Sequence, residues 1–365
     1  MVDEGVHWVH VTGWSMVQPS PYRDLPDSAY WRRAVANLRP IDVDPVTDVL
    51  FKIGPDDLVA TAGSCFAQHI SRTLVESGFK YLVTEPGDRE QGFGIFPARF
   101  GNIYTPKQLL QLFQLAYGLR GGSDPAWKRH RDAVFVDGFR PLVAPAGFAS
   151  EEELVGDRAA HLVAVRQMFE RCDVFIFTLG LTEGWRSTRT GFVVPSAPGV
   201  AASPANGEVF EFVNFPVPDM ADDLAALVDK MRVVNPGVRI ILTVSPVPLI
   251  ATYEDRHVLV STVYSKSALR VVAEMVSKAK RGVAYFPSYE IITGHHHGYR
   301  YFEQDLRSVS NEGVHHVMSI FARHFLTGEK APPLRETARR NASLEDGQMP
   351  EDLYGIVCDE EIIDP

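Results

Sequence analysis

The feature that most constrains the fold of this chain is a series of short apolar runs that alternate with longer helical patterns. The clearest runs cover residues 173–179 and 239–244, and both are predominantly apolar without regular polar alternation. A strand of this kind must be covered on both faces, as in a parallel sheet between two layers of helices. We therefore expect a three-layer α/β/α fold with a central, mostly parallel sheet.

Other segments fit the same alternation. Further strands are expected at residues 57–62, 81–83 and 283–286. Thr105 and Pro106 mark one helix start, since Thr is a good N-cap and Pro suits the first helical position. That helix is expected over residues 105–118, and the remaining helical patterns cover residues 66–75, 151–171, 220–233, 261–280 and 311–325.

Two Gly-, Pro- and Ala-rich stretches interrupt this alternation of strands and helices, at residues 121–148 and 191–218. Neither has helical spacing, so we expect loops or insertions, which are often lids or binding segments when they are this long. We divide the chain into an extended N-terminal arm packed on the core (1–50), one α/β domain (51–328) and an acidic C-terminal tail (329–365).

Composition excludes several classes of function. A formal net charge of -10 over 365 residues argues against nucleic-acid binding and against docking on an anionic membrane. Three widely spaced cysteines suit neither a disulfide framework nor a cysteine zinc site. With no signal peptide or membrane-spanning run visible, we expect a cytoplasmic protein.

The first candidate for chemistry is Ser64, in the stretch GSCFA at residues 63–67. It follows an expected strand and precedes an expected helix, whose N-terminus favours developing negative charge. Ser64 is therefore a candidate nucleophile, although Gly-Ser pairs also simply cap helices. Cys65 is the alternative nucleophile, but adjacent residues point in different directions and we favour Ser64.

More polar residues follow other expected strands or precede helices. Asn102 and Tyr104 lie before the Thr105 helix start, and Gly180 and Glu183 follow the run 173–179. Because the carboxyl ends of parallel strands share one edge of the sheet, these residues are expected beside Ser64. A nucleophile with nearby amide donors suits acyl transfer.

Ordinary structural roles compete with each of these assignments. Asn102 could be a turn residue, and Glu183 could be an acid in the first turn of a helix. Tyr104, Trp127 and Trp185 could stack on sugar rings or could be core residues.

The stretch at residues 63–67 resembles the signature of the GSCFA family, which is related to the SGNH hydrolases. The resemblance runs over about residues 56–325. It implies an SGNH-hydrolase-like, flavodoxin-like fold with Ser64 as nucleophile, and with Asn102, Gly180 and Glu183 in oxyanion or substrate binding. Tyr104 is a further candidate for substrate binding, because its ring could stack on a sugar. The other blocks that carry the resemblance are Gly101-Asn102, Gly180 with Glu183, and residues 235–237 and 285–290. Apart from the resemblance, we expect no cofactor and no metal, because adjacent histidines on a loop, as at residues 295–297, seldom all point inward.

One further segment, at residues 305–308, departs from the pattern of the related hydrolases, which have an Asp-x-x-His pair late in the chain. Residues 305–308 read DLRS, so Asp305 is present but Ser308 stands where an Asp-x-x-His pair has its histidine. Asp305 would then orient a histidine from elsewhere, since geometry rather than chain order defines such sites. His69 and His257 are the main candidates, and the triple histidine at residues 295–297 is a further one.

Together with these residues, the resemblance implies a serine hydrolase that removes an O-acyl group, such as acetyl, from a small-molecule or glycan ester. The carbohydrate type of the substrate is implied by the resemblance alone. Two other interpretations stay open: an O-acyltransferase acting on a glycan, and a catalytically inactive domain that binds a glycan or a protein. Neither nucleic acid nor membrane is an expected partner, and the sequence predicts no oligomeric state.

Overall fold

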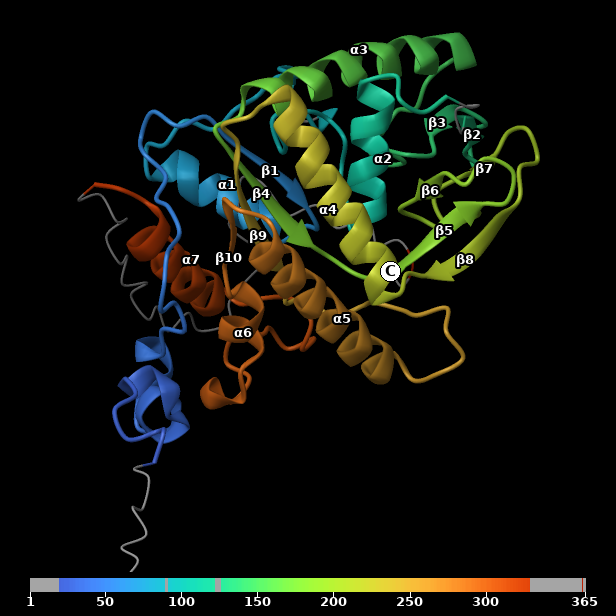
Figure 1. The fold of residues 1–365 in the computed structure, drawn as a ribbon. Coiled ribbons are helices and arrows are strands. Elements are labelled where there is room, and N and C mark those ends of the chain that lie inside the picture. The colour runs from blue at the N-terminus through green and yellow to red at the C-terminus, as the bar shows by residue number, and fades with distance from the viewer. Residues whose placement is uncertain (1–19, 89–90, 122–125, 329–362, 364–365) are drawn as a thin grey trace, which may run out of the picture. The chain divides into compact units, whose positions relative to one another are not determined.

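The centre of the computed structural model is a sheet of four parallel strands in the order β1-β4-β9-β10 (Figure 1). Tyr81 forms a parallel bridge to Val59 on the free edge of β1. With this bridge the order becomes Tyr81-β1-β4-β9-β10, which is the strand order of a flavodoxin-like sheet. The expected run 81–83 is therefore a single bridge rather than a full strand. The strands are β1 (Val59–Gly63), β4 (Val174–Leu179), β9 (Arg239–Val244) and β10 (Val283–Tyr285).

The structure describes residues 20–88, 91–121, 126–328 and 363. Contacts divide the chain into two units, one up to Val43 and one from Asp44 onward. The first unit has short helical turns at η1 (Asp27–Ala29), η2 (Arg32–Ala36) and η3 (Pro40–Asp42). The N-terminal arm stays a prediction, and the acidic tail lies almost wholly outside the described residues.

Helices cover both faces of the sheet, which confirms the three-layer α/β/α arrangement (Figure 1). Alternate residues of β4 serve the two layers, because successive strand side chains point to opposite faces. Phe175 and Phe177 pack with one layer, and Val174 and Ile176 with the other. The first layer comprises α2 (Pro106–Ala116), α3 (Glu151–Arg171), α4 (Val217–Val234) and α5 (Val258–Ala279). The second comprises α1 (Ala67–Glu76), α6 (Ser288–Thr293) and α7 (Asn311–Phe325).

Helix starts follow local capping chemistry. Thr105 Oγ1 accepts a hydrogen bond from the N–H of Gln108, and Gln108 Oε1 accepts one from the N–H of Thr105, which completes a capping box. Ser150 caps α3 and Ser310 caps α7 in the simpler way, through one hydroxyl. These caps fix where the loops at the carboxyl edge of the sheet meet their helices.

The two stretches expected to be loops contain short antiparallel strands. Trp127 is fully buried in the small core between them, packed with Val136, Val194 and Ala202. That core, rather than local sequence, stabilises the pairing. One sheet has the order β3-β2-β7 and the other β6-β5-β8: β2 (Ala126–Lys128), β3 (Phe135–Asp137), β5 (Glu183–Ser187), β6 (Val193–Val194), β7 (Ser203–Pro204) and β8 (Phe210–Asn214).

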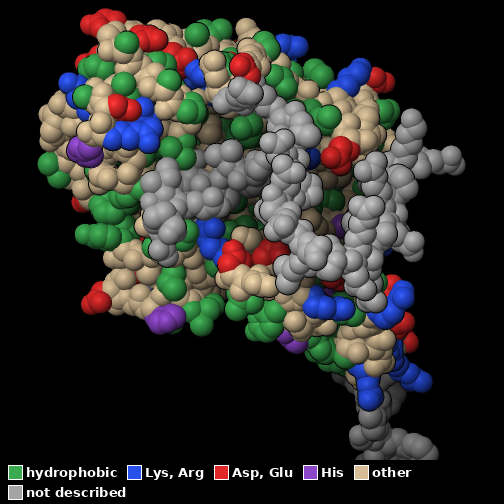
Figure 2. Space-filling view, turned by 180° about the vertical axis from the view of Figure 1, so that it is seen from behind, with side chains coloured by type: hydrophobic (Ala, Val, Ile, Leu, Met, Phe, Trp, Pro, Cys, Tyr) green, Lys and Arg blue, Asp and Glu red, His purple; other side chains and the backbone are tan. Residues whose placement is uncertain are grey.

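Figure 2 shows basic and acidic side chains in small separate groups among apolar and other atoms on the face drawn there. Within the described part of the chain, no helix is both long enough and apolar enough to span a bilayer.

Candidate functional site

Ser64 stands immediately after β1, where β1 and β4 approach closely. Gly63 has a φ of 141°, and a Cβ there would clash with the carbonyl oxygen of Thr178 and lie 2.7 Å from the Thr178 Cβ. The N–H of Ser64 donates to that same oxygen at 3.2 Å. Only glycine fits this approach, and it places Ser64 in a tight turn that leads into α1 at Ala67.

The hydroxyl of Ser64 is buried. The residue is 3 % exposed, and its Oγ has no hydrogen-bond partner among the described residues. Leaving a buried hydroxyl unsatisfied costs roughly 1–3 kcal/mol. A polar group kept at such a cost beside a helix N-terminus is consistent with a role in chemistry rather than in folding.

The loop before α2 lies against the ends of β1 and β4. The N–H of Ile103 donates to Gly63 O at 2.9 Å, and the N–H of Gly180 donates to Tyr104 O at 2.8 Å. A Cβ on Gly180 would lie 2.7 Å from the Tyr104 ring, so this contact also requires glycine. The structure thus brings Asn102, Tyr104 and Gly180 to the sheet edge that carries Ser64.

These contacts change which donors could stabilise an oxyanion. The N–H groups of Ser64 and Gly180 are both used by backbone carbonyls, Thr178 O and Tyr104 O. Two other candidates are the side-chain amide of Asn102 and the N–H of Cys65, which follows Ser64 directly and precedes the N-cap of α1, Phe66. Cys65 is itself buried.

Comparison with known protein families decides what kind of chain this is. The GSCFA family model matches residues 58–321, which include the stretch at 63–67 and the loops that surround it. The chain belongs to the GSCFA family. No curated protein matches it.

In this GSCFA protein, Asp305 is engaged by its own loop. It is exposed, and its carboxylate accepts hydrogen bonds from the Ser308 hydroxyl at 2.6 Å and from the N–H groups of Arg307 and Ser308 at 2.9 Å. Although partial burial raises the pKa of Asp305, the hydrogen bonds from Ser308 and Arg307 together hold that pKa below its usual range. Ser308 therefore contacts the very carboxylate that a histidine would contact in an Asp-x-x-His pair.

The two main candidate histidines lie on different helices. His257 is exposed and caps α5, its Nδ1 accepting from the N–H of Leu259 at 3.1 Å. His69 lies in α1 with its ring 5.3 Å from that of Phe66, and burial, with the nearby Arg72, lowers the pKa of His69 to about 4. Among the described residues, no imidazole forms a hydrogen bond with Ser64 Oγ.

The triple histidine forms a short turn, η5 (His295–His297), of which only His297 is buried. His297 is buried, contacts Ile292 O through Nε2 at 2.8 Å and stacks on the ring of Tyr301 at 4.1 Å. The hydroxyl of Tyr301 lies 2.7 Å from Nδ1 of His316. Within the described ranges, no group of three His, Cys, Asp or Glu residues is arranged to hold a metal ion.

Glu183 begins β5 rather than a helix. Its carboxylate accepts from the Thr252 hydroxyl at 2.6 Å and from the N–H of Tyr253 at 3.3 Å, and burial raises the pKa of Glu183. Glu183 therefore holds the segment that leads into α5 beside the strand end.

Lys266 is a residue of this edge that the sequence analysis did not select. It lies in α5, is 3 % exposed, and its Nζ donates to Gly180 O at 2.5 Å. Its neighbour Ser265 accepts from the N–H of Thr182 at 3.0 Å. The sequence did contain an indication that Lys266 is buried, because Lys266 lies three residues before Leu269, on the same buried face of the helix.

Proposed function

We propose that this GSCFA protein is a serine hydrolase that cleaves O-acyl esters of carbohydrate type, with Ser64 as the nucleophile. The observation that carries the proposal is the hydroxyl of Ser64, which is buried at the carboxyl edge of a parallel sheet. It has no hydrogen-bond partner among the described residues. Open α/β sheets use this edge for their active sites.

The chemistry follows from the groups around Ser64. Its Oγ attacks the ester carbonyl carbon while a base accepts its proton, and the carbonyl oxygen takes the negative charge. We assign the stabilisation of that charge to the side-chain amide of Asn102 and the N–H of Cys65. The alcohol then leaves with the proton, and water releases the acyl group from Ser64. His69 and His257 remain the proposed bases, with Asp305 as the proposed orienting acid.

Labelling by a fluorophosphonate probe and turnover of a short-chain aryl ester test this proposal. We expect both in the wild-type protein and neither in Ser64→Ala. Ser77→Ala is a matched control, because the Ser77 hydroxyl is also buried and partnerless among the described residues but lies at the far end of α1. Labelling that persists in Ser64→Ala would refute the role of Ser64.

The same assays identify the base and the nucleophile. His69→Gln and His257→Gln should differ, with turnover reduced by about 10²-fold or more in the variant that lacks the base. Inactivation by iodoacetamide, together with turnover retained in Ser64→Ala, would assign the nucleophile to Cys65 instead. Product analysis with and without an added alcohol acceptor separates hydrolysis from acyl transfer.

A second candidate is a catalytically inactive domain that binds a glycan or a protein. It is favoured by the absence of an imidazole on Ser64 Oγ among the described residues and by the engagement of Asp305 with Ser308. Wild-type protein that shows neither labelling nor turnover would support this candidate.

A further inference from the structure

A small cavity is lined in part by the loop that carries Asn102. Its volume is about 40 Å³, room for about three water molecules or a group with as many non-hydrogen atoms. The loop is the one whose Ile103 N–H contacts Gly63 O, so the cavity is close to the candidate nucleophile. Its lining includes Asn102, Phe139, Arg140, Arg158, His161 and Leu162.

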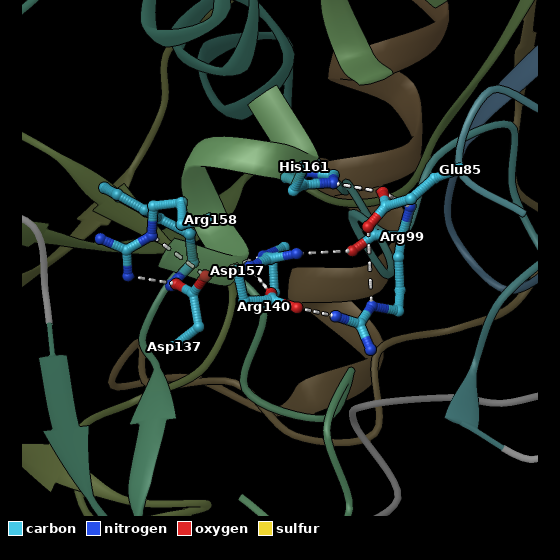
Figure 3. Close-up of polar contacts among 8 residues, drawn as sticks. Glu85, Arg99, Asp137, Arg140, Asp157, Arg158 and His161 are labelled. Carbon is cyan, nitrogen blue, oxygen red and sulfur yellow. Dashed lines mark hydrogen bonds and ion pairs between the residues drawn. The ribbon is translucent and has the colours of Figure 1, made fainter. Parts of the chain in front are cut away.

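The polar side of the cavity belongs to a buried network of charged residues (Figure 3). The carboxylate of Asp137 accepts from Arg140 and, through both oxygens, from Arg158. Asp157 accepts from Arg140 at 2.7 Å and also from Arg99. Although burial raises the pKa of Asp137, the charges of Arg158 and Arg140 hold it well below its usual range.

This network disfavours an anion in the cavity. The guanidinium groups of Arg140 and Arg158 are directed at carboxylates, and Arg140 also donates to Arg99 O. An incoming anion would have to displace the Asp137 carboxylate from one of these guanidinium groups. That displacement is costly, because it leaves a buried charge without its partner. The occupant that fits is therefore uncharged.

The protonation state of His161 determines whether its ring nitrogen Nε2 donates or accepts a hydrogen bond. It is 1 % exposed, and its Nδ1 lies 2.7 Å from Glu85 Oε2. Burial, with the charge of Arg140, lowers the pKa of His161 to about 4. Burial also raises the pKa of Glu85, but contacts with His161, Arg99 and Arg140 together hold that pKa below its usual range. At neutral pH, Nδ1 therefore carries the proton that it donates to Glu85, and Nε2 is an acceptor.

Nε2 of His161 is buried and has no hydrogen-bond partner among the described residues. A buried acceptor of this kind is stabilised by a donor. His161 is one of the residues that line the cavity, which has room for a donor. Among the described residues, the structure thus combines a small volume, balanced charges and the acceptor Nε2 of His161.

We propose that this cavity binds one uncharged alcohol group, whose O–H donates a hydrogen bond to Nε2 of His161. In the proposed hydrolase this group is a hydroxyl on the alcohol portion of the ester, and to that extent the inference rests on the proposed function. The binding site itself does not depend on catalysis by Ser64.

The test uses the full-length Ser64→Ala protein with isotope-labelled histidine, observed by NMR. The probes are ethanol, acetonitrile and formate, which have equal numbers of non-hydrogen atoms. Ethanol can donate, acetonitrile cannot, and formate is an anion. We expect a saturable change in the His161 Nε2 resonance with ethanol alone. His316 is the internal control, since its Nε2 is also buried and partnerless among the described residues and should not respond.

Leu162→Phe, which narrows the cavity without touching the charged network, should abolish the response to ethanol. A response to formate equal to that to ethanol, or no saturable response to ethanol, would overturn the proposal; the latter would mean that only water occupies the cavity. Wild-type protein without esterase activity would refute the proposed function but leave an ethanol response standing.

Discussion

At the scale of single residues, Gly63 is the position where backbone geometry most directly serves the candidate site. Its φ of 141° and its approach to Thr178 leave no room for a Cβ. Ser64 owes its position to this close approach of β1 and β4.

We expect Gly63→Ala to reduce the free energy of unfolding by at least about 3 kcal/mol, because backbone strain and overpacking add. Urea denaturation measures the change. Gly156→Ala is the control: Gly156 lies inside α3, and a Cβ added there would meet nothing within 4 Å, so alanine should add about 0.5–1 kcal/mol. A Gly63→Ala protein as stable as wild type would contradict the close approach.

The hydroxyl of Ser64 should lower stability rather than contribute to it. Its Oγ is buried without a partner among the described residues, so Ser64→Ala removes an unsatisfied group. We expect the free energy of unfolding to rise by about 1 kcal/mol. A loss of stability in urea denaturation would mean that the hydroxyl has a partner that supports the fold.

At the scale of secondary-structure elements, the capping box of α2 links helix formation to the candidate site. Gln108 Oε1 accepts from the N–H groups of both Thr105 and Tyr104 at 3.0 Å. The cap therefore anchors the loop that carries Asn102 as well as the first turn of the helix.

Thr105→Ala should reduce the free energy of unfolding by about 1 kcal/mol, the usual effect of losing an N-cap hydroxyl. If Asn102 stabilises the oxyanion, turnover of an aryl ester should fall as well, because its loop is less firmly held. Thr105→Ser keeps the hydroxyl and should restore both. Equal losses in the serine and alanine variants would argue against the capping hydrogen bond.

Elements with strong local signals were predicted closely. The helices at residues 151–171 and 311–325 have the predicted bounds, since acids, caps and apolar periodicity agree there. The helices predicted at 220–233 and 261–280 begin three residues earlier, at Val217 and Val258. The short strands around Trp127 were missed because pairing between distant segments, not local pattern, forms them.

At the scale of the whole molecule, buried histidines should make stability depend on pH. His161 and His316 are both buried, and burial lowers the pKa of each to about 4, helped by Arg140 for His161. The unfolded chain binds protons near the ordinary pKa of histidine, whereas the folded chain does not until the pH is far lower. Stability must therefore fall as the pH decreases between these two values.

We expect each of these two histidines to remove about 2 to 3 kcal/mol from the free energy of unfolding between about pH 6.5 and about pH 4. Carboxylates with lowered pKa values, such as Asp137, add their loss only at still lower pH. Urea denaturation across this range measures the slope. It should be shallower in His161→Gln and His316→Gln, and a flat profile in the wild type would contradict neutral buried imidazoles.

The sequence by itself determined the layered α/β architecture and the position of Ser64 at a strand end. Apolar runs between helical patterns require a sheet that is covered on both faces. The carboxyl ends of parallel strands then share one edge, which is why Asn102, Tyr104 and Gly180 could be placed near Ser64 without a structure.

Only the tertiary structure decided which polar groups meet. Lys266 donates to Gly180 O, and Glu85 meets His161 across 76 positions of the chain. Such contacts depend on how helices and insertions pack, and no periodicity or spacing encodes which buried side chain finds which partner. The sequence therefore located the candidate nucleophile, and the fold determined its surroundings.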